Sequence, residues 1–372
     1  MERGTVTVRG ERISAVDSYG GRTADVDLGN VAIIPGLVNS HVHLDLSGLA
    51  GKAPPSADFC GWLKAIIAHR RTQSPAQIEA DIRAGLAKAL SFGTTTLGDI
   101  AGGGSSLPIL RDASCTSIVY HELLGLSARR AQDAWLSIGR LIRDHADNDR
   151  CMVGLSPHAP YSVHHSLFRA AGRTGLPLAT HLAETREEQQ LLDDHTGPFA
   201  DFLQEVGAWE EDALVPSHDW LLWRCGRARS LLLAHGNYLD TVIPSNATVV
   251  YCPRTHAAFG HEPHPFREML RQGVRVALGT DSLASNPDLD LLAEVRFVAE
   301  HYPEVPREQL LRMATLNGAE GMGLGSLTGS LQPGKYADLV AVPLPDRDEA
   351  DVHELIVEYI DGKRQTMWRG MW

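Results

Sequence analysis

The sequence predicts an α/β fold, a (β/α)8 barrel accompanied by a small β domain that both termini build. In the middle of the 372-residue chain, short apolar runs alternate with helical stretches, whereas both ends read as strands. Alternating β and α units imply a parallel sheet, and about eight of them over roughly 290 residues fit a barrel better than an open sheet. Because the terminal strands flank the barrel in sequence, we expect them to meet in space as one discontinuous domain.

The amino-terminal segment has the pattern of a hairpin. Residues Thr5 to Val16 read TVTVRGERISAV, two alternating runs separated by a glycine-containing turn. The carboxyl end has two further strand-like regions, Ala337 to Pro343 and Leu355 to Trp368. Within the second region, Asp361-Gly362 is expected to form a two-residue hairpin turn. Both termini are therefore expected to be rich in β-strand.

The central region contains a helical stretch from Ile78 to Phe92 and a series of apolar runs that read as barrel strands. After the first run, Val31 to Ser40, these strands are expected at Thr94 to Leu97, Val153 to Ser156, Leu178 to Ala183, Leu231 to His235, Ala247 to Tyr251 and Val274 to Gly279. No internal repeat or linker interrupts the series.

The charge balance excludes several classes of partner. With 34 basic and 46 acidic side chains the formal charge is −12, and the arginines are scattered, so the chain lacks the basic surface that nucleic acid requires. No apolar stretch approaches the roughly 18 residues that span a membrane, and the first residues lack a signal-peptide core. We therefore expect a cytoplasmic protein with a small-molecule substrate, for which a homodimer is an acceptable assembly.

The composition also indicates which ligands could hold a metal. The five cysteines form no CxxC pair, which argues against a thiolate zinc site and against a disulfide framework. The chain has 17 histidines. If a metal is bound, imidazole and carboxylate groups must hold it.

Polar side chains stand where predicted strands end. His41 and His43 follow a strand at i and i+2, which places both on one face. His181 ends the run LPLAT, His235 ends SLLLA and Asp281 ends VRVALGT. Barrel enzymes place catalytic residues at this rim. Each histidine alone reads more simply as a packed core residue and Asp281 as a helix N-cap, but their coincidence at four strand ends favours one site.

Longer motifs resemble the amidohydrolase superfamily, in particular its cytosine-deaminase-like (ATZ/TRZ-type) branch of aminohydrolases. They spread from residue 35 to residue 341 and read PGLVNSHVHLD, HLAE, AHGNYL, LGTDSLASNPDLDLLAE and ATLNGAEGMGLGSLTGSLQPGKYADLV. The resemblance implies a metal-dependent hydrolase TIM barrel over residues 36–327. It also implies that the terminal segments, residues 1–35 and 328–372, form a small β-sandwich.

The same resemblance implies a set of site residues. One divalent ion, zinc in the first place and iron as the alternative, is expected on His41, His43, His181 and Asp281. The resemblance gives His235 a hydrogen bond to the attacking water or to substrate, and makes Glu184 the proton shuttle. Asp281 is also expected to act as a catalytic base, because a ligand that touches the water can accept its proton.

The lysines indicate one ion and not two. Relatives with two ions bridge them through a carbamylated lysine in the middle of the barrel. The lysines of this chain are residues 52, 64, 88, 335 and 363, so none lies between 88 and 335. A carbamate bridge from the later barrel strands is therefore excluded.

These features predict a deaminase that converts C–NH2 to C=O on an amino-substituted purine or related nucleoside ring. Glu184 carries this prediction because members of the superfamily that cleave simple amides lack it, although it also reads as a carboxylate at a helix start. One alternative on the same scaffold is a hydrolase of cyclic amides or of chloro- or methylthio-substituted rings. Another is a catalytically silent metal-binding scaffold. The presence of Glu184 and His235 argues against it, because a structural ion needs neither a proton shuttle nor an open coordination position.

Three residues are expected to contact the substrate. His158, in SPHAPY, is the first choice for a hydrogen bond, although two prolines could hold that loop for structural reasons. Arg254, in YCPRTHAAFGH, offers a planar fork suited to a carboxylate, or could pair with an acid such as Glu262. This segment resembles sequences described as aminodeoxyfutalosine deaminases, which makes 6-amino-6-deoxyfutalosine a candidate substrate. Trp62 could wall the base pocket or belong to the core.

Overall fold

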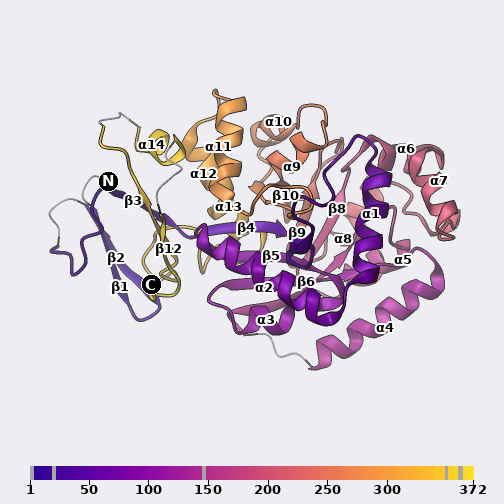
Figure 1. Ribbon diagram of the computed structural model, residues 1–372, viewed down its shortest axis with the longest axis horizontal. Helices are drawn as coiled ribbons and strands as arrows, with labels where there is room; N and C mark the ends of the chain where they lie inside the picture. The colour runs from indigo at the N-terminus through magenta and orange to yellow at the C-terminus, as the bar shows by residue number, and fades with distance from the viewer. Residues whose placement is uncertain (1–3, 19–21, 145–147, 348–350, 359–362) are drawn as a thin grey trace.

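The computed structural model describes residues 4–18, 22–144, 148–347, 351–358 and 363–372. At its centre, eight parallel strands pair in chain order and form the predicted barrel (Figure 1). The barrel strands are β4 (Leu37–Val42), β5 (Thr94–Ala101), β6 (Thr116–Leu123), β7 (Cys151–Pro157), β8 (Leu178–Leu182), β9 (Leu231–His235), β10 (Ala247–Tyr251) and β11 (Val276–Leu278). A parallel bridge between Val42 and Asp281 connects the last strand to the first.

Strand β6 is the barrel strand that the apolar pattern does not reveal. Thr116, Ser117, His121 and Glu122 interrupt its hydrophobic run, yet all eight of its residues are buried. Neighbouring strands and helices cover both faces of a parallel barrel strand, so polar residues are buried there too when they serve the site. The carboxyl end of β6 brings His121 and Glu122 towards the catalytic rim.

Helices surround the barrel and cover its outer face (Figure 1). They are α1 (Phe59–Thr72), α2 (Pro75–Ser91), α3 (Leu107–Arg111), α4 (Ala128–Asp144), α5 (His165–Ala171), α6 (Arg186–Asp194), α7 (Pro198–Glu205), α8 (His218–Cys225), α9 (Pro253–Ala258), α10 (Phe266–Arg271), α11 (Leu291–His301), α12 (Arg307–Met313) and α13 (Leu316–Gly321). Short 3-10 helices occur at Leu44–Leu49, Gly102–Gly104 and Glu211–Ala213. Among the described residues, no helix has the length and apolarity that a membrane crossing requires.

Local signals explain where the predicted helix at Ile78 begins. Ser74 caps α2 through a reciprocal bond with Gln77, and Pro75 occupies the first turn, where its missing N–H is not needed. The inner face of α2 places Ile82 and Leu86 in the core between this helix and the barrel. Burial of each such side chain stabilises the fold by about 1.5–3 kcal/mol.

The terminal segments form the small sandwich that the sequence predicts. Strands β1 (Thr5–Arg9) and β2 (Arg12–Asp17) are an antiparallel hairpin, and β12 (Leu339–Pro343) pairs antiparallel with both β3 (Val31–Pro35) and β13 (Gln365–Met367). Ile13, Leu339 and Met367 share one buried apolar cluster between the two layers. The chain passes from β3 into β4 at residue 36, which joins the sandwich directly to the barrel.

One element at the carboxyl end differs from the prediction. The run that starts at Leu355 was expected to be a strand, but the structure forms helix α14 (Val352–Glu358) there, and the expected turn at Asp361-Gly362 lies outside the described residues. Leu355, Ile356 and Val357 are buried, and the helix packs against α11 and α12. The strand prediction was wrong because tertiary packing overrode the β-propensity of these residues.

A glycine permits the first and last barrel strands to approach closely. A Cβ atom on Gly279 would lie 2.9 Å from both the Cβ and the carbonyl oxygen of His41, a distance that no side chain tolerates. Without that side chain, the N–H of Asp281 donates to the His41 carbonyl at 3.1 Å. The closure of the barrel therefore sets two predicted metal ligands side by side.

Candidate metal and catalytic centre

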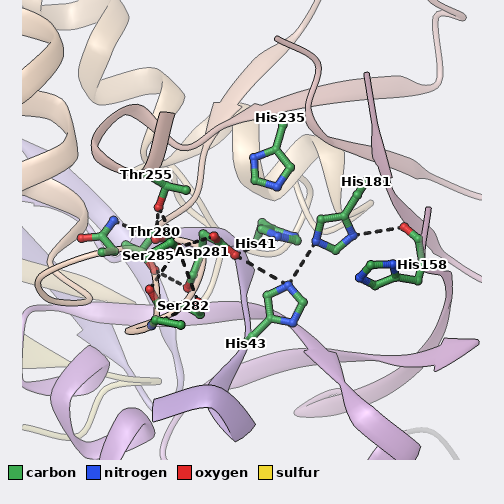
Figure 2. A network of polar contacts seen from close by, with 12 residues as sticks. His41, His43, His158, His181, His235, Thr255, Thr280, Asp281, Ser282 and Ser285 are labelled. Carbon is green, nitrogen blue, oxygen red and sulfur yellow. Dashed lines mark hydrogen bonds and ion pairs between the residues drawn. The ribbon is translucent and has the colours of Figure 1, made fainter. Parts of the chain in front are cut away.

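Five polar side chains converge at the carboxyl end of the barrel (Figure 2). They are His41 and His43 from the end of β4, His181 from β8, His235 from β9 and Asp281 just after β11. All five are buried. Candidate ligand atoms of His41, His43 and His181 lie within 4.8 Å of one another, and so do those of His41, His235 and Asp281. The structure thus brings together the four ligands predicted from the sequence and places His235 beside them.

The donor set fits one divalent ion. The Nε2 atoms of His43 and His181 lie 3.2 Å apart, and Oδ1 of Asp281 is 3.6 Å from Nε2 of both His41 and His43. Two nitrogens that bind one tetrahedral zinc ion at about 2.0–2.1 Å are separated by about 3.3 Å. The buried Nε2 of His41 has no hydrogen-bond partner among the described residues. The site therefore offers a set of ligand atoms that point at a common position.

The protonation states suit metal binding. Burial, together with the neighbouring histidines, holds the pKa of His43 and His181 well below the usual range, so these rings are neutral. Burial acts to raise the pKa of Asp281, but contacts with His41, His235 and Ser285 lower it overall. Nδ1 of His181 donates to the His158 carbonyl at 3.1 Å, which leaves its Nε2 lone pair for an ion.

Three residues of the centre have left-handed backbone conformations. Their φ angles are +51° for Ala183, +69° for His235 and +57° for Asp281. Such conformations cost about 1–3 kcal/mol each and persist only where the surroundings hold them. His264 Nε2 donates to the His235 carbonyl at 2.8 Å, and the Ser285 hydroxyl donates to Oδ2 of Asp281 at 2.5 Å. These contacts fix the directions in which His235 and Asp281 project.

Glu184 and His235 form a pair beside the candidate ligands. Glu184 is buried, and its Oε1 lies 3.3 Å from His235 Nε2. Burial raises the pKa of Glu184 well above its usual value, and the charges of Asp281 and Glu188 raise it further. Burial lowers the pKa of His235 to about 3 despite the opposing charge of Asp281. A carboxyl group with a raised pKa next to an imidazole with a lowered pKa is an arrangement suited to acid–base chemistry.

His158 adjoins the candidate ligands at the end of β7. Its ring centre is 4.5 Å from that of His181, and the side chain is partly exposed (Figure 2). Nδ1 lies 2.9 Å from the Ser162 hydroxyl, while Nε2 faces Oε1 of Glu122 at 3.7 Å. This predicted substrate contact is therefore next to the ion site, with its orientation set by two polar neighbours.

Trp62 packs within an aromatic cluster of α1 and the end of α9. Its indole N–H donates to the Ala53 carbonyl at 3.0 Å, and its ring meets Phe259 edge-on with the ring centres 5.0 Å apart. Phe59 packs against both of these rings. The polar atom of Trp62 is thus already used, so its contribution to a pocket is restricted to its apolar faces.

Arg254 forms ion pairs with two acids near the start of α11. Its Nη1 and Nη2 contact the two Asp288 oxygens at 3.0 and 2.6 Å, and Nε donates to Glu294 at 2.6 Å. The alternative that Arg254 pairs with an acid of the chain is therefore correct, although the acids are Asp288 and Glu294 and Glu262 pairs with Arg186 at 2.6 Å. The guanidinium that the sequence offered to a substrate carboxylate is engaged within the protein.

The structure adds charged groups that the sequence does not reveal. Arg70, from α1, bridges Asp45 at 3.0 Å and Glu122 at 2.9 Å, and both acids are buried. No motif connects these three residues, since they come from separate segments. Glu188, by contrast, follows Glu184 by four residues, so the spacing HxxExxxE could have marked it.

A match over most of the chain identifies its family. The chain belongs to the amidohydrolase family, whose sequence profile matches residues 32–370. The resemblance predicted from the motifs is therefore confirmed, and the protein is a hydrolase of a metal-dependent family.

The chain is similar to several proteins that are named as deaminases. It is 27% identical to the aminodeoxyfutalosine deaminase of a Nitratiruptor species, over 85% of this chain and 80% of that protein. It is 29% identical to a 5-methylthioadenosine/S-adenosylhomocysteine deaminase of Teredinibacter turnerae, over 90% and 77% respectively. The crystal structure of Helicobacter pylori aminofutalosine deaminase with methylthio-coformycin has the same fold, with a TM-score of 0.83, 21% identity and coverage of 98% and 93%.

Proposed function

We propose that this protein is a metal-dependent aminohydrolase that releases ammonia from an amino-substituted purine ring or a related nucleoside. The position of Glu184 carries the proposal. A buried carboxyl group with a raised pKa lies 3.3 Å from His235, on the rim that also holds the four candidate ligands. A structural metal site needs neither a protonated acid nor a neutral imidazole beside it.

The proposed ion is a single zinc, with iron as the alternative, on His41, His43, His181 and Asp281. When bound, such an ion lowers the pKa of a water ligand from about 15.7 to roughly 7 and so supplies a nucleophile at neutral pH. Three imidazoles and one carboxylate suit either metal. The absence of lysine between residues 88 and 335 supports one ion.

The side chains divide the proton transfers between them. Asp281, which is ionised, accepts the proton of the attacking water. Glu184 delivers a proton to a ring nitrogen, which makes the adjacent C–NH2 carbon electrophilic, and His235 donates a hydrogen bond to the new oxygen. The C–O bond forms, the proton held by Asp281 passes to the amino group, and the C–N bond breaks as ammonia leaves. Glu184 takes back a proton from the new hydroxyl group, which becomes C=O, so that ring N=C–NH2 and water give ring N(H)–C=O and NH3.

The proposed substrate is a nucleoside with a 6-aminopurine base, and 6-amino-6-deoxyfutalosine is the first candidate. The two deaminases named above support this class, because both of their named activities concern an adenine ring. We propose that His158 hydrogen-bonds the substrate and that Trp62 provides an apolar wall. Arg254 gives this candidate no support, since its guanidinium is bound to Asp288 and Glu294.

A coupled ammonia assay on the zinc-loaded enzyme tests the proposal. The panel comprises adenosine, methylthioadenosine, adenosylhomocysteine, aminodeoxyfutalosine, guanine and cytosine. Turnover of at least one nucleoside with release of one ammonia per product is the expected result. Opening of a cyclic amide, or release of chloride or methanethiol from a substituted ring without deamination of the panel, would instead identify the alternative hydrolase. A metal-loaded protein that is inactive in every assay would support the alternative of a catalytically silent metal-binding scaffold.

A further inference from the structure

We propose that Glu188, held by His218, is a positioning residue for the proton donor Glu184. The inference rests on the proposed function, since it assigns a role to the surroundings of the proposed acid. Glu188 touches neither a candidate ligand nor the position where substrate would react. It acts through the backbone of Ala183 and Glu184, the two residues that follow the segment ending in His181 and Leu182.

The carboxylate of Glu188 accepts hydrogen bonds from that backbone. The N–H of Ala183 donates to Oε1 at 2.8 Å, and the N–H of Glu184 lies 3.4 Å from Oε2. Glu188 is the third residue of α6, whose N-cap Thr185 accepts from the Glu188 N–H at 3.1 Å. In an ordinary capping box the side chain at this position returns to the N-cap residue itself. Here it reaches one and two residues further back, to the segment that carries the acid.

A second helix holds the carboxylate in place. His218, the first residue of α8, contacts Oε1 of Glu188 through Nε2 at 3.0 Å. The Glu188 side chain is completely buried. A buried carboxylate is expensive unless its oxygens are bound, and three donors here satisfy it.

The opposite side of the same two peptides is also held. The Tyr238 N–H donates to the Ala183 carbonyl at 3.0 Å, and Asn237 Nδ2 donates to the Glu184 carbonyl at 2.9 Å. Both donors belong to the loop that follows His235. Glu188 on one side and this loop on the other thus fix the peptide planes between β8 and α6.

The backbone conformation shows why such a clamp is needed. Ala183 has a φ of +51°, which is unfavourable for a residue with a side chain, and it is completely buried. This turn directs Glu184 back towards His235 at 3.3 Å. Relaxation of Ala183 to a negative φ would swing the carboxyl group away from the reacting atoms. A displacement of about 1 Å in a catalytic group can lower turnover about 100-fold.

Glu188→Gln in the zinc-loaded enzyme tests the clamp. Glutamine keeps the size of the side chain but replaces one carboxylate oxygen by an NH2 group. That group faces a backbone N–H and cannot accept its hydrogen bond. We expect hydrogen exchange at the Ala183 and Glu184 amides to accelerate at least about tenfold, since their protection comes from these bonds. With the best substrate of the panel, kcat should fall about 10- to 100-fold while KM changes less than about threefold. Zinc content should stay at one equivalent.

Two further variants separate positioning from folding. Glu187→Gln removes a charge from the same turn of α6 and leaves the clamp intact, so its exchange and kcat should match the wild type. His218→Leu keeps the Glu188 carboxylate and removes the donor that holds it, so it should shift exchange and kcat in the same direction as Glu188→Gln. This variant also provides the test if Glu188→Gln does not fold.

The outcomes distinguish this inference from the proposed function. Unchanged amide exchange and a kcat within twofold of the wild type in Glu188→Gln and His218→Leu would overturn the positioning role. So would a lower melting temperature with unchanged kcat for the folded enzyme, which indicates a purely structural role. If the wild type deaminates no panel member, the proposed function fails, and amide exchange alone then decides whether the clamp exists.

Discussion

Replacement of Glu184 by glutamine should abolish most of the turnover and spare the metal. The amide has the shape of the carboxyl group, so the 3.3 Å contact with His235 and the bond from Asn237 to the Glu184 carbonyl can persist. It cannot deliver the proton that the proposed mechanism assigns to Glu184, a carboxyl group whose pKa burial raises well above its usual value. General acid–base catalysis contributes about 100- to 10,000-fold, or about 2.7–5.4 kcal/mol at 1.36 kcal/mol per tenfold.

The assay is steady-state ammonia release by zinc-loaded Glu184→Gln, with zinc content and thermal unfolding measured on the same sample. We expect kcat to fall by the full factor, with one equivalent of zinc and a melting temperature within a few degrees of the wild type. Glu187→Gln serves as the control for loss of a nearby charge. A kcat for Glu184→Gln within tenfold of the wild type, at full zinc content, would remove Glu184 from the mechanism.

Three other predictions follow from the same geometry. His181→Ala should lose the co-purifying ion, and zinc at 100 times its Kd, which stabilises the wild type by about 2.7 kcal/mol, should no longer shift its melting temperature. Arg254→Ala removes the ion-pair partner of buried Glu294, so urea unfolding should show a free energy of unfolding lower by about 3–5 kcal/mol. Turnover of substrates with and without a carboxylate should fall alike. A loss restricted to carboxylated substrates would instead show that Arg254 binds the substrate. Burial lowers the pKa of His264 to about 3, so below about pH 6.5 the unfolded chain binds more protons. The unfolding free energy of the metal-free protein should therefore decrease from pH 6.5 towards pH 4, by up to about 1.4 kcal/mol per pH unit for this histidine, and equal stability at pH 7 and pH 5 would contradict the assignment.

The convergence of the candidate ligands could be predicted because its signals are local. His41 and His43 lie two residues apart on a strand, and His181, His235 and Asp281 each end a run of apolar residues. In a parallel barrel all strand ends of one kind lie on one rim, so topology alone brings such residues together. The structure places these five side chains where that rule requires.

Other interactions could not be predicted because they join segments that are distant in sequence. The sequence left open whether Arg254 binds a substrate carboxylate or an acid of the chain, and only the placement of α11 gives it Asp288 and Glu294. The pairing of His218 with Glu188 likewise depends on where α8 meets α6. The run from Leu355 became a helix for the same reason, since its environment decided its conformation.

The sequence by itself therefore determined the barrel, the terminal sandwich, the family and the residues that can hold one ion. Strand periodicity, strand order and the spacing of polar residues suffice for these, because each follows from local pattern and chain topology. The tertiary structure alone decided the partners of the charged side chains and the backbone conformations of Ala183, His235 and Asp281. Burial disfavours the charged form of a side chain, and neighbouring charges and hydrogen bonds can add to this effect or reverse it. Those neighbours come together only in the folded chain.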